Sequence, residues 1–97
     1  MYKISKLAED DIYQIAIYTI QQFGHSQAKK YHGELQKTFE LLVESCWLGR
    51  ECNWLCDGIR RFEFKKHVIY YTMQSDSIFI SRVIHQSMDV ELLDFPE

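Results

Sequence analysis

The spacing of apolar residues changes once along this chain, and that change constrains the fold more than any other feature. Between Ala8 and Cys46, apolar side chains recur every three or four residues, which is the period of an amphipathic helix. Between Phe62 and Ile84, they follow the shorter period of strands. A chain of 97 residues can build one hydrophobic core but not two. We therefore expect one α+β domain over residues 1–97, in which the helices precede most of the strands.

Two consecutive helices are expected after a short strand at the start of the chain. Residues 2–5 alternate apolar and polar side chains, as a strand would, and the helical period begins after them. Gly24 stands where a glycine would end a helix, and Ser26 is the expected N-cap of the second helix. The short link between the helices favours an antiparallel hairpin. The two apolar stripes are formed by Ala8, Ile12, Ile15, Ala16, Thr19 and Phe23, and by Ala28, Tyr31, Leu35, Phe39, Leu42 and Cys46.

Three strands are expected in the second half of the chain. Residues 47–58 look irregular and end in Asp57-Gly58, which is a strong turn signal. Strand-forming residues then occupy 61–64, 68–73 and 78–84, with Lys65, Lys66 and His67 at a solvated turn. The economical layout is β-α-α-β-β-β, with the helical hairpin packed on one face of a mainly antiparallel sheet. The other face of the sheet would then be free to contact macromolecules.

Charge and hydropathy argue against several classes of function. The formal net charge of −3 disfavours a protein that binds nucleic acid directly and sequence-specifically, because phosphate contacts need clustered Lys and Arg. A local basic surface is still available, since five basic and two acidic residues lie between positions 60 and 82. We expect no membrane segment, because no run of about 18 apolar residues is present. The charged start lacks the apolar stretch of a secretory signal, so the expected location is the cytoplasm.

The cysteines and histidines do not indicate a cofactor. Cys46, Cys52 and Cys56 are an odd number, and cytoplasmic thiols stay reduced. A structural zinc site usually has two matched pairs of ligands, whereas Cys52-x-x-x-Cys56 is a single pair, even with His67 nearby in the sequence. Buried cysteine usually acts as a small apolar residue. We therefore expect neither a metal nor any other cofactor.

Several short motifs occur in an order that resembles the ParE/RelE toxin superfamily, and ParE most closely. The similarity runs from about Ile4 to Asp89. Each motif is weak alone, but six of them in the right order form a specific signal. The motifs are Ala8-x-x-Asp11-Ile12-x-x-Ile15, Tyr18-x-x-x-x-Phe23-Gly24-x-x-x-Ala28-x-x-Tyr31, Leu48-Gly49-Arg50, Gly58-Ile59-Arg60-Arg61-Phe62, His67-Val68-Ile69-Tyr70-Tyr71 and Arg82-Val83-Ile84-His85-Gln86-x-Met88-Asp89.

The resemblance implies the toxin component of a type II toxin–antitoxin system, and a protein that is not an enzyme. A toxin of this family is neutralised by a ParD-like antitoxin within a hetero-oligomer, and it inhibits DNA gyrase when it is free. Two alternatives remain open. One is a ribosome-dependent mRNA interferase of the RelE type, and the other is a non-toxic module that only binds an antitoxin.

The interferase alternative would need a catalytic set, for which the candidates are Glu51, Arg61 and His85. RNA cleavage of this kind uses a proton acceptor for the 2′-hydroxyl and a cation for the phosphate. These residue types could supply both groups if the fold brought them together. His85 also lies inside the ParE-like ending, where hydrogen bonds that hold the last strand are the simpler role.

Partner contacts are expected at tryptophan, arginine and tail residues. Tryptophan is enriched at the energetic centres of interfaces, although the same side chains could cover the core. Neighbouring strand residues point to opposite faces, so Arg60 and Arg61 cannot both serve one site. Residues 90–97 form a candidate docking tail that binds either its own domain or a partner. The whole set is Trp47, Trp54, Leu55, Arg60, Arg61, Arg82, Leu92, Leu93 and Phe95.

Overall fold

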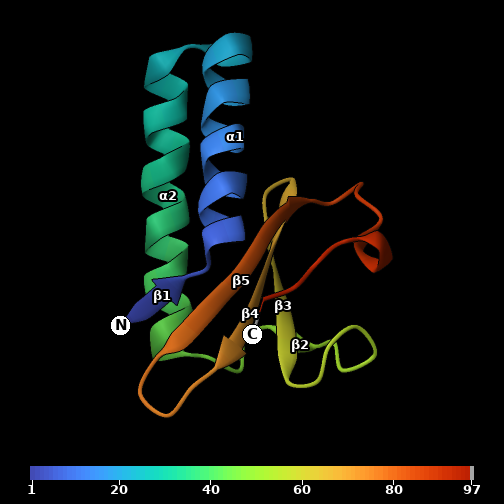
Figure 1. The fold of residues 1–97 in the computed structure, drawn as a ribbon. Coiled ribbons are helices and arrows are strands. Elements are labelled where there is room, and N and C mark those ends of the chain that lie inside the picture. Colours follow the sequence, from blue (N-terminus) through green and yellow to red (C-terminus); the bar gives the residue numbers. More distant parts are fainter. Residues whose placement is uncertain (97) are drawn as a thin grey trace.

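The computed structural model describes residues 1–96 and shows two long helices beside a five-stranded sheet (Figure 1). The spatial strand order is β1-β5-β4-β3-β2, and the α+β layout expected from the sequence is confirmed. Within residues 1–96, no helix is long and apolar enough to cross a membrane. The elements are β1 (Tyr2–Ile4), α1 (Lys6–Phe23), α2 (His25–Glu44), β2 (Arg50–Glu51), β3 (Ile59–Phe64), β4 (His67–Met73), β5 (Ile78–His85) and a 3-10 turn (Val90–Leu92).

The start of α1 is fixed by Ser5, which the alternating pattern had placed in the first strand. Its hydroxyl accepts a hydrogen bond from the backbone N–H of Ala8 at 2.9 Å, as an N-cap does. The same hydroxyl donates to the carbonyl of Ser81 on β5 at 2.6 Å. Ser5 therefore ends β1, starts α1 and ties both to the sheet.

A single glycine joins the two helices. Gly24 has a φ of 92°, which residues with a side chain rarely adopt. It is both the C-cap of α1 and the N-cap of α2. Its N–H donates to the carbonyl of Ile20 at 2.9 Å, and its carbonyl accepts from Ala28 N at 3.2 Å. The expectation that Ser26 caps the second helix is wrong, because Ser26 lies inside α2. The link is shorter than the sequence suggested, and the hairpin is antiparallel (Figure 1).

The sheet is a mixed one, built around the antiparallel meander β3-β4-β5. β1 pairs in parallel with the first half of β5, with Tyr2 opposite Ile78. A bulge at Tyr70/Tyr71 shifts the register between β4 and β5. The segment 47–58 is not wholly irregular, because β2 within it pairs with β3 along the outer edge of the sheet.

The main core lies between the hairpin and one face of the sheet. Phe39 and Leu42 of α2 and Tyr71 of β4 are among its fully buried side chains. The Tyr71 hydroxyl donates to the carbonyl of Cys46 at 2.7 Å and accepts from the Gly49 N–H at 2.9 Å. Burial raises the pKa of Tyr71, so the hydroxyl keeps its proton as a donor. The core thereby holds the chain segment that follows α2.

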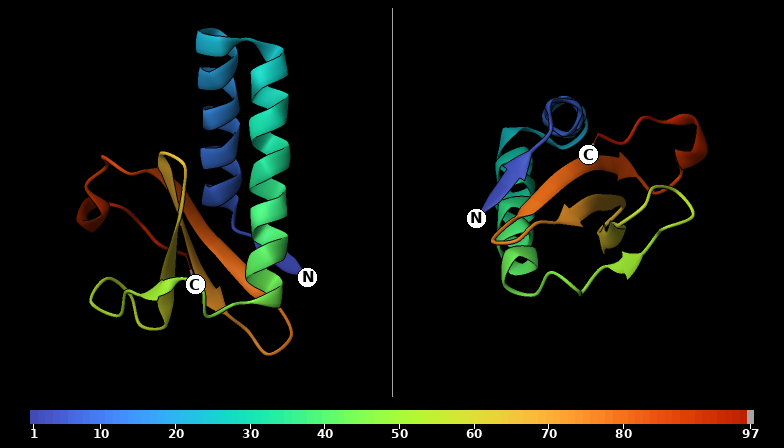
Figure 2. Two further views of the ribbon diagram at one scale, coloured as in Figure 1. Left: turned by 180° about the vertical axis from the view of Figure 1, so that it is seen from behind. Right: turned by 60° about the horizontal axis from the view of Figure 1, so that its bottom comes forward.

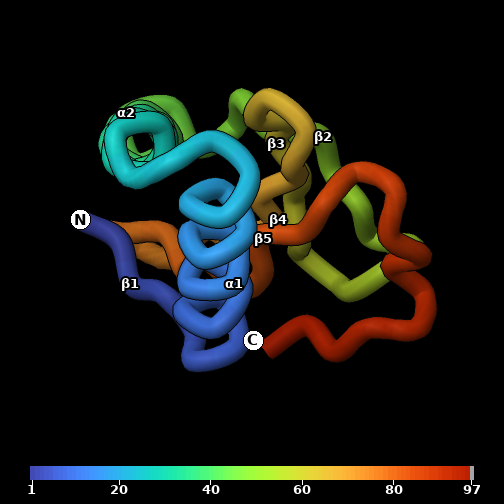
Figure 3. Tube along the Cα trace, turned by 90° about the horizontal axis from the view of Figure 1, so that it is seen from above, coloured from blue at the N-terminus to red at the C-terminus, as the bar shows by residue number. Residues whose placement is uncertain are grey.

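The second face of the sheet carries a smaller apolar cluster, and the expectation that this face is free is wrong over much of its area. Ile59, Val68, Tyr70 and Ile84 are buried there with Cys52. The loop before β3 and the segment after β5 cover them, on the side of the sheet away from the helices (Figures 2 and 3). The covering side chains are Leu55, Cys56, Val90, Leu93 and Phe95.

Candidate functional site

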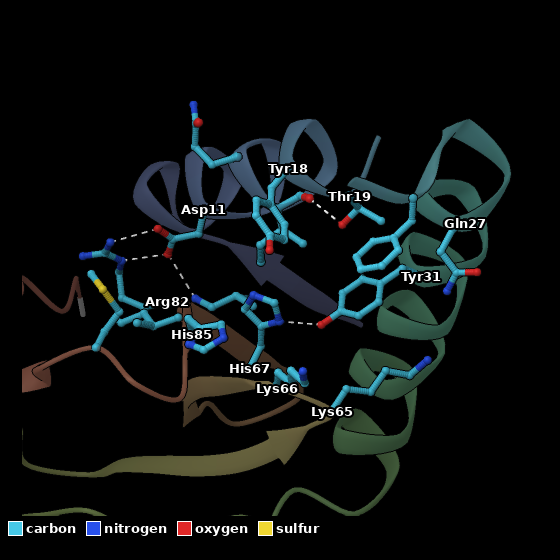
Figure 4. Close-up of a pocket in the computed structure, with 16 residues that line it drawn as sticks. Asp11, Tyr18, Thr19, Gln27, Tyr31, Lys65, Lys66, His67, Arg82 and His85 are labelled. Atoms are coloured by element: carbon cyan, nitrogen blue, oxygen red, sulfur yellow. Dashed lines mark hydrogen bonds and ion pairs between the residues drawn. The ribbon is translucent and has the colours of Figure 1, made fainter. Parts of the chain in front are cut away.

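An open groove of about 810 Å³ lies between the helical hairpin and the end of the sheet (Figure 4). The hairpin extends well beyond the sheet, so the far halves of α1 and α2 form one wall (Figure 1). The other wall is the turn between β3 and β4 together with the last residues of β5. The lining residues include Asp11, Ile15, Tyr18, Thr19, Phe23 and Tyr31 from the helices, and Lys65, Lys66, His67, Arg82, Val83, His85 and Met88 from the sheet side.

The groove exists because the apolar stripe of α1 is longer than the surface that covers it. Ala8 at the start of the stripe is fully buried against the sheet, whereas Phe23 at its end is 68% exposed. Tyr18 beside the stripe is also exposed, and both aromatic residues line the groove. Exposed apolar surface gathered in a concavity is typical of a site where another macromolecule docks.

The groove also has a polar side, formed by a tyrosine and two histidines. The Tyr31 hydroxyl lies 2.5 Å from Nδ1 of His67, and the rings of His67 and His85 meet edge to face with centroids 5.4 Å apart (Figure 4). Burial, helped by the nearby Glu34 carboxylate, raises the pKa of Tyr31 to about 12. Burial and the neighbouring His85 lower the pKa of His67. Both side chains are therefore neutral at pH 7.

Asp11 of α1 and Arg82 of β5 line one end of the groove. The Arg82 guanidinium donates to both Asp11 carboxylate oxygens, from Nε at 2.8 Å and Nη2 at 2.9 Å. Its third bond goes to the carbonyl of Asp94 in the tail at 2.9 Å. The hydrogen bonds from Arg82 to Asp11 raise the pKa of Arg82 further. Asp11 also accepts from the backbone N–H of Val83 at 3.0 Å, at a point of the β5 edge that β1 does not reach.

The two arginines on β3 point in opposite directions, as the strand period requires. Arg60 donates to the carbonyls of Gly49 at 2.6 Å and Trp47 at 3.3 Å, and it forms an ion pair with Glu51 at 3.3 Å. It therefore holds the loop before β2 on its own domain. Arg61 pairs in register with Tyr70, and its Nε is buried without a hydrogen-bond acceptor in the described part of the chain.

The other expected partner residues divide into exposed and docked side chains. Trp47, Trp54 and Leu92 are exposed and stay predicted partner contacts. Leu55 and Leu93 pack on the second face of the sheet, as does Phe95, whose ring meets Tyr70 at 4.9 Å between centroids. Residues 90–96 of the tail thus dock on their own domain, and Glu97 lies outside the described residues.

Glu51, Arg61 and His85 are not brought together. Glu51 is on β2, opposite Arg60 of β3, whereas His85 is on β5, opposite His67 of β4. The strands β3 and β4 therefore lie between Glu51 and His85. Three inter-strand steps of about 4.8 Å already separate the two backbones by roughly 14 Å. His85 instead holds the turn after β5, through Ser87 Oγ at 2.7 Å from its Nδ1. A single scissile phosphate could not contact all three side chains.

No metal centre is formed within residues 1–96. The three cysteines there form no disulfide, and no three or more His, Cys, Asp or Glu side chains gather as metal ligands. The residues that sequence reasoning missed are Tyr31 and His67. Tyr31 looked like part of a buried stripe, and His67 looked like part of a solvated turn. His67 is in fact half-buried as the first residue of β4.

The fold and the groove define a small α+β protein with a long helical hairpin on a mixed sheet and an open groove between them. One solved structure, described as the chromosomal ParDE TA system from P. aeruginosa, has the same fold with a TM-score of 0.74 and 18% identity. The match covers 87% of this chain and 92% of that chain.

The sequence comparisons identify the family. The model of the ParE toxin of type II toxin–antitoxin system, parDE, matches residues 2–90. Toxin ParE1 of Caulobacter vibrioides is 36% identical over 88 residues, which are 91% of each chain. Toxin ParE1 of Mycobacterium tuberculosis is 30% identical over 91 residues, which are 93% of each chain. The chain belongs to the ParE toxin family of type II toxin–antitoxin systems.

Proposed function

We propose that this ParE-type toxin is neutralised by a ParD-like antitoxin that fills the groove, and that the free toxin inhibits DNA gyrase. The observation that carries the first half is the surplus apolar stripe of α1, whose aromatic end is exposed in a concavity of about 810 Å³. A helical segment with apolar side chains would bury this stripe. An antitoxin tail that orders only on binding is suited to such a surface.

The charges around the groove support an acidic partner segment. Lys65 and Arg82 are paired with Glu34 and Asp11, whereas Lys66 has no ion pair within residues 1–96. The groove therefore carries surplus positive charge, although the whole chain has a net charge of −3. Complementary charge would guide the antitoxin to this surface and fix its register.

The gyrase part of the proposal rests on family membership and on the separation of the candidate nuclease residues. Glu51, Arg61 and His85 lie too far apart to act on one phosphate, which favours action by binding over RNA cleavage. We assign Trp47 and Trp54 to the contact with gyrase, because they are exposed and lie on a loop outside the groove. Large aromatic side chains are typical anchors of such contacts.

The role of the groove in antitoxin binding is tested by substituting two tyrosines of α1, one inside the groove and one outside it. Tyr18 is 59% exposed and lines the groove, whereas Tyr13 is 61% exposed and does not. The chain is purified together with a ParD-like antitoxin, the two proteins are separated, and their binding is measured by calorimetry. Tyr18→Ser should weaken binding by roughly 30-fold, as the loss of an aromatic anchor does, and Tyr13→Ser by less than about twofold. Equal effects of the two changes would remove the groove from the interface.

The action on gyrase is tested with purified toxin, freed of antitoxin, in a supercoiling assay. Inhibition that falls with Trp54→Ala and returns to baseline when antitoxin is added would support the proposal. A folded toxin without effect on gyrase would defeat it. Ribosome-dependent mRNA cleavage would then indicate the RelE-type alternative, and harmless overexpression with tight complex formation would indicate a non-toxic module.

A further inference from the structure

Two histidines stand side by side in the groove and are bonded in the same way. His67 and His85 are register partners on β4 and β5, and both line the groove. Each Nδ1 meets a hydroxyl group, that of Tyr31 at 2.5 Å and that of Ser87 at 2.7 Å. A hydroxyl can either donate or accept, so it satisfies Nδ1 whether the imidazole is neutral or protonated. Both hydroxyl contacts can therefore persist when a ring becomes protonated, whereas the bond that Nδ1 of His85 accepts from the Ser87 N–H requires a neutral ring.

The Nε2 atoms remain for a ligand. Within residues 1–96, neither Nε2 atom has a hydrogen-bond partner. The backbone N–H of Ser87 also donates to Nδ1 of His85 at 3.1 Å, which places the proton of the neutral ring on Nε2. A neutral His67 that accepts from Tyr31 likewise carries its proton on Nε2. Both rings can then donate from Nε2 to an acceptor that enters the groove.

The groups around His67 and His85 favour a negatively charged hydrogen-bond acceptor as the ligand. From α1, the Asp11 carboxylate is held by Arg82 of β5, and Tyr18 contributes its phenol ring to the lining of the groove. From α2, Glu34 forms an ion pair with Lys65, so its carboxylate is also occupied.

Two further groups complete the surroundings of the histidines. Tyr31 of α2 keeps its proton up to a pKa of about 12, so it stays uncharged beside His67. Lys66, in the turn before β4, has no ion pair in the part of the chain that the structure describes. Among the described residues around the pair, the carboxylates of Asp11 and Glu34 are thus both held in ion pairs.

We propose that His67 and His85 form a receptor for a carboxylate side chain of the antitoxin, and that the complex binds a proton at this pair as it forms. This inference rests on the function proposed above and names the chemistry by which the groove recognises its partner. An aspartate or glutamate between the two Nε2–H groups would accept from both and would stabilise the imidazolium form. An apolar helix without an acid at this position would leave both donors without a partner.

The direction of the pH effect follows from linkage. In the free chain, burial and the neighbouring ring keep the pKa of His67 below its ordinary value. A bound carboxylate raises the pKa of the pair, so the complex holds more protons than the free proteins. Affinity therefore increases as the pH falls from above the pKa of the complex towards that of the free chain, by up to about tenfold per pH unit for one proton. The expected window is roughly pH 7.5 to 5.5, around the ordinary pKa of histidine.

Calorimetry of the purified toxin with its purified antitoxin tests this directly. Titrations at roughly pH 6.5, in buffers of different ionisation enthalpy, give the number of protons taken up. We expect an uptake of about 0.5 to 1 proton and an affinity three- to tenfold tighter at pH 6.0 than at pH 7.5. Two variants should lower the uptake: His67→Asn, whose amide can still bond Tyr31, and His85→Gln, at an exposed position.

His32→Gln is the matched control, because His32 is exposed on α2 and lies outside the groove. It should keep the uptake of the unaltered chain, and thermal melting of every variant checks that the domain is folded. Binding without proton uptake, or uptake that persists in the double variant of His67 and His85, would overturn this inference and leave the proposed function standing. Failure of toxin and antitoxin to form any complex would overturn both.

Discussion

Replacing Asp11 by Asn should destabilise the domain more than any other single charge removal on α1. The Asp11 carboxylate accepts three hydrogen bonds, two from Arg82 and one from the Val83 N–H. Whichever way an amide is turned, its NH₂ group faces at least one of these donors and that bond is lost. The side chains of Arg82 and Asp11 are only 13% and 15% exposed, so water compensates poorly. Losing one or two charge-assisted bonds in this setting costs about 3 kcal/mol.

Urea unfolding followed by circular dichroism measures this cost, and Asp10→Asn is the control. Asp10 is the exposed neighbour of Asp11, so the control removes the same charge from the same turn of α1. With a urea dependence of about 1.5 kcal/mol per M, the midpoint of Asp11→Asn should fall by about 2 M and that of Asp10→Asn by less than about 0.3 M. Equal midpoints for the two variants would show that Asp11 acts through general electrostatics and not through its bonds to Arg82 and β5.

Two further predictions concern stability. A Cβ at Gly49 would lie 2.5 Å from the Tyr71 hydroxyl, so Gly49→Ala should lower the free energy of unfolding by about 2 kcal/mol. A Cβ at Gly33 would have no atom within 4 Å, so Gly33→Ala should raise the free energy of unfolding by about 0.5 to 1 kcal/mol. Melting curves in which Gly49→Ala is the more stable of the two variants would contradict the packing described. Phe95→Ser should cost about 2 kcal/mol and increase binding of a hydrophobic dye, because it uncovers the second face of the sheet. Leu92 is 82% exposed, so Leu92→Ser should change neither the stability nor the dye binding. Equal dye binding by the Phe95 and Leu92 variants would show that the tail does not cover that face.

The period of the apolar residues predicted the helical hairpin and the meander because both depend on which side of an element is buried. The exact links depended on contacts that the period does not contain. Gly24, with a φ of 92°, ends one helix and is the N-cap of the next, so Ser26 does not cap the second helix. The pairing of β2 depends on Arg60, which bonds the carbonyls of Trp47 and Gly49 across the loop. Such bonds between distant residues leave no local pattern.

The groove could be predicted only in part, for a related reason. The stripe from Ala8 to Phe23 showed that these residues share one face of α1, and they do. Where the sheet stops along that stripe is set by the register of β5 and β4, and the sequence does not show it. His67 illustrates the same limit: its place beside Lys65 and Lys66 indicated a solvated turn, whereas the hairpin brings Tyr31 over it.

The basic segment between positions 60 and 82 shows how an acidic protein can still present a positive surface. Two of its arginines are used inside the domain, since Arg60 holds the loop before β2 and Arg82 holds Asp11 and the tail. Their charges are balanced by carboxylates and backbone carbonyls and are not offered to a partner. In the turn before β4, next to the two histidines, Lys65 is paired with Glu34, whereas Lys66 has no ion pair within residues 1–96. Recognition of an acidic partner would therefore depend on a few side chains at one end of the sheet, and a change of one charge there should alter binding more than the net charge of the chain suggests.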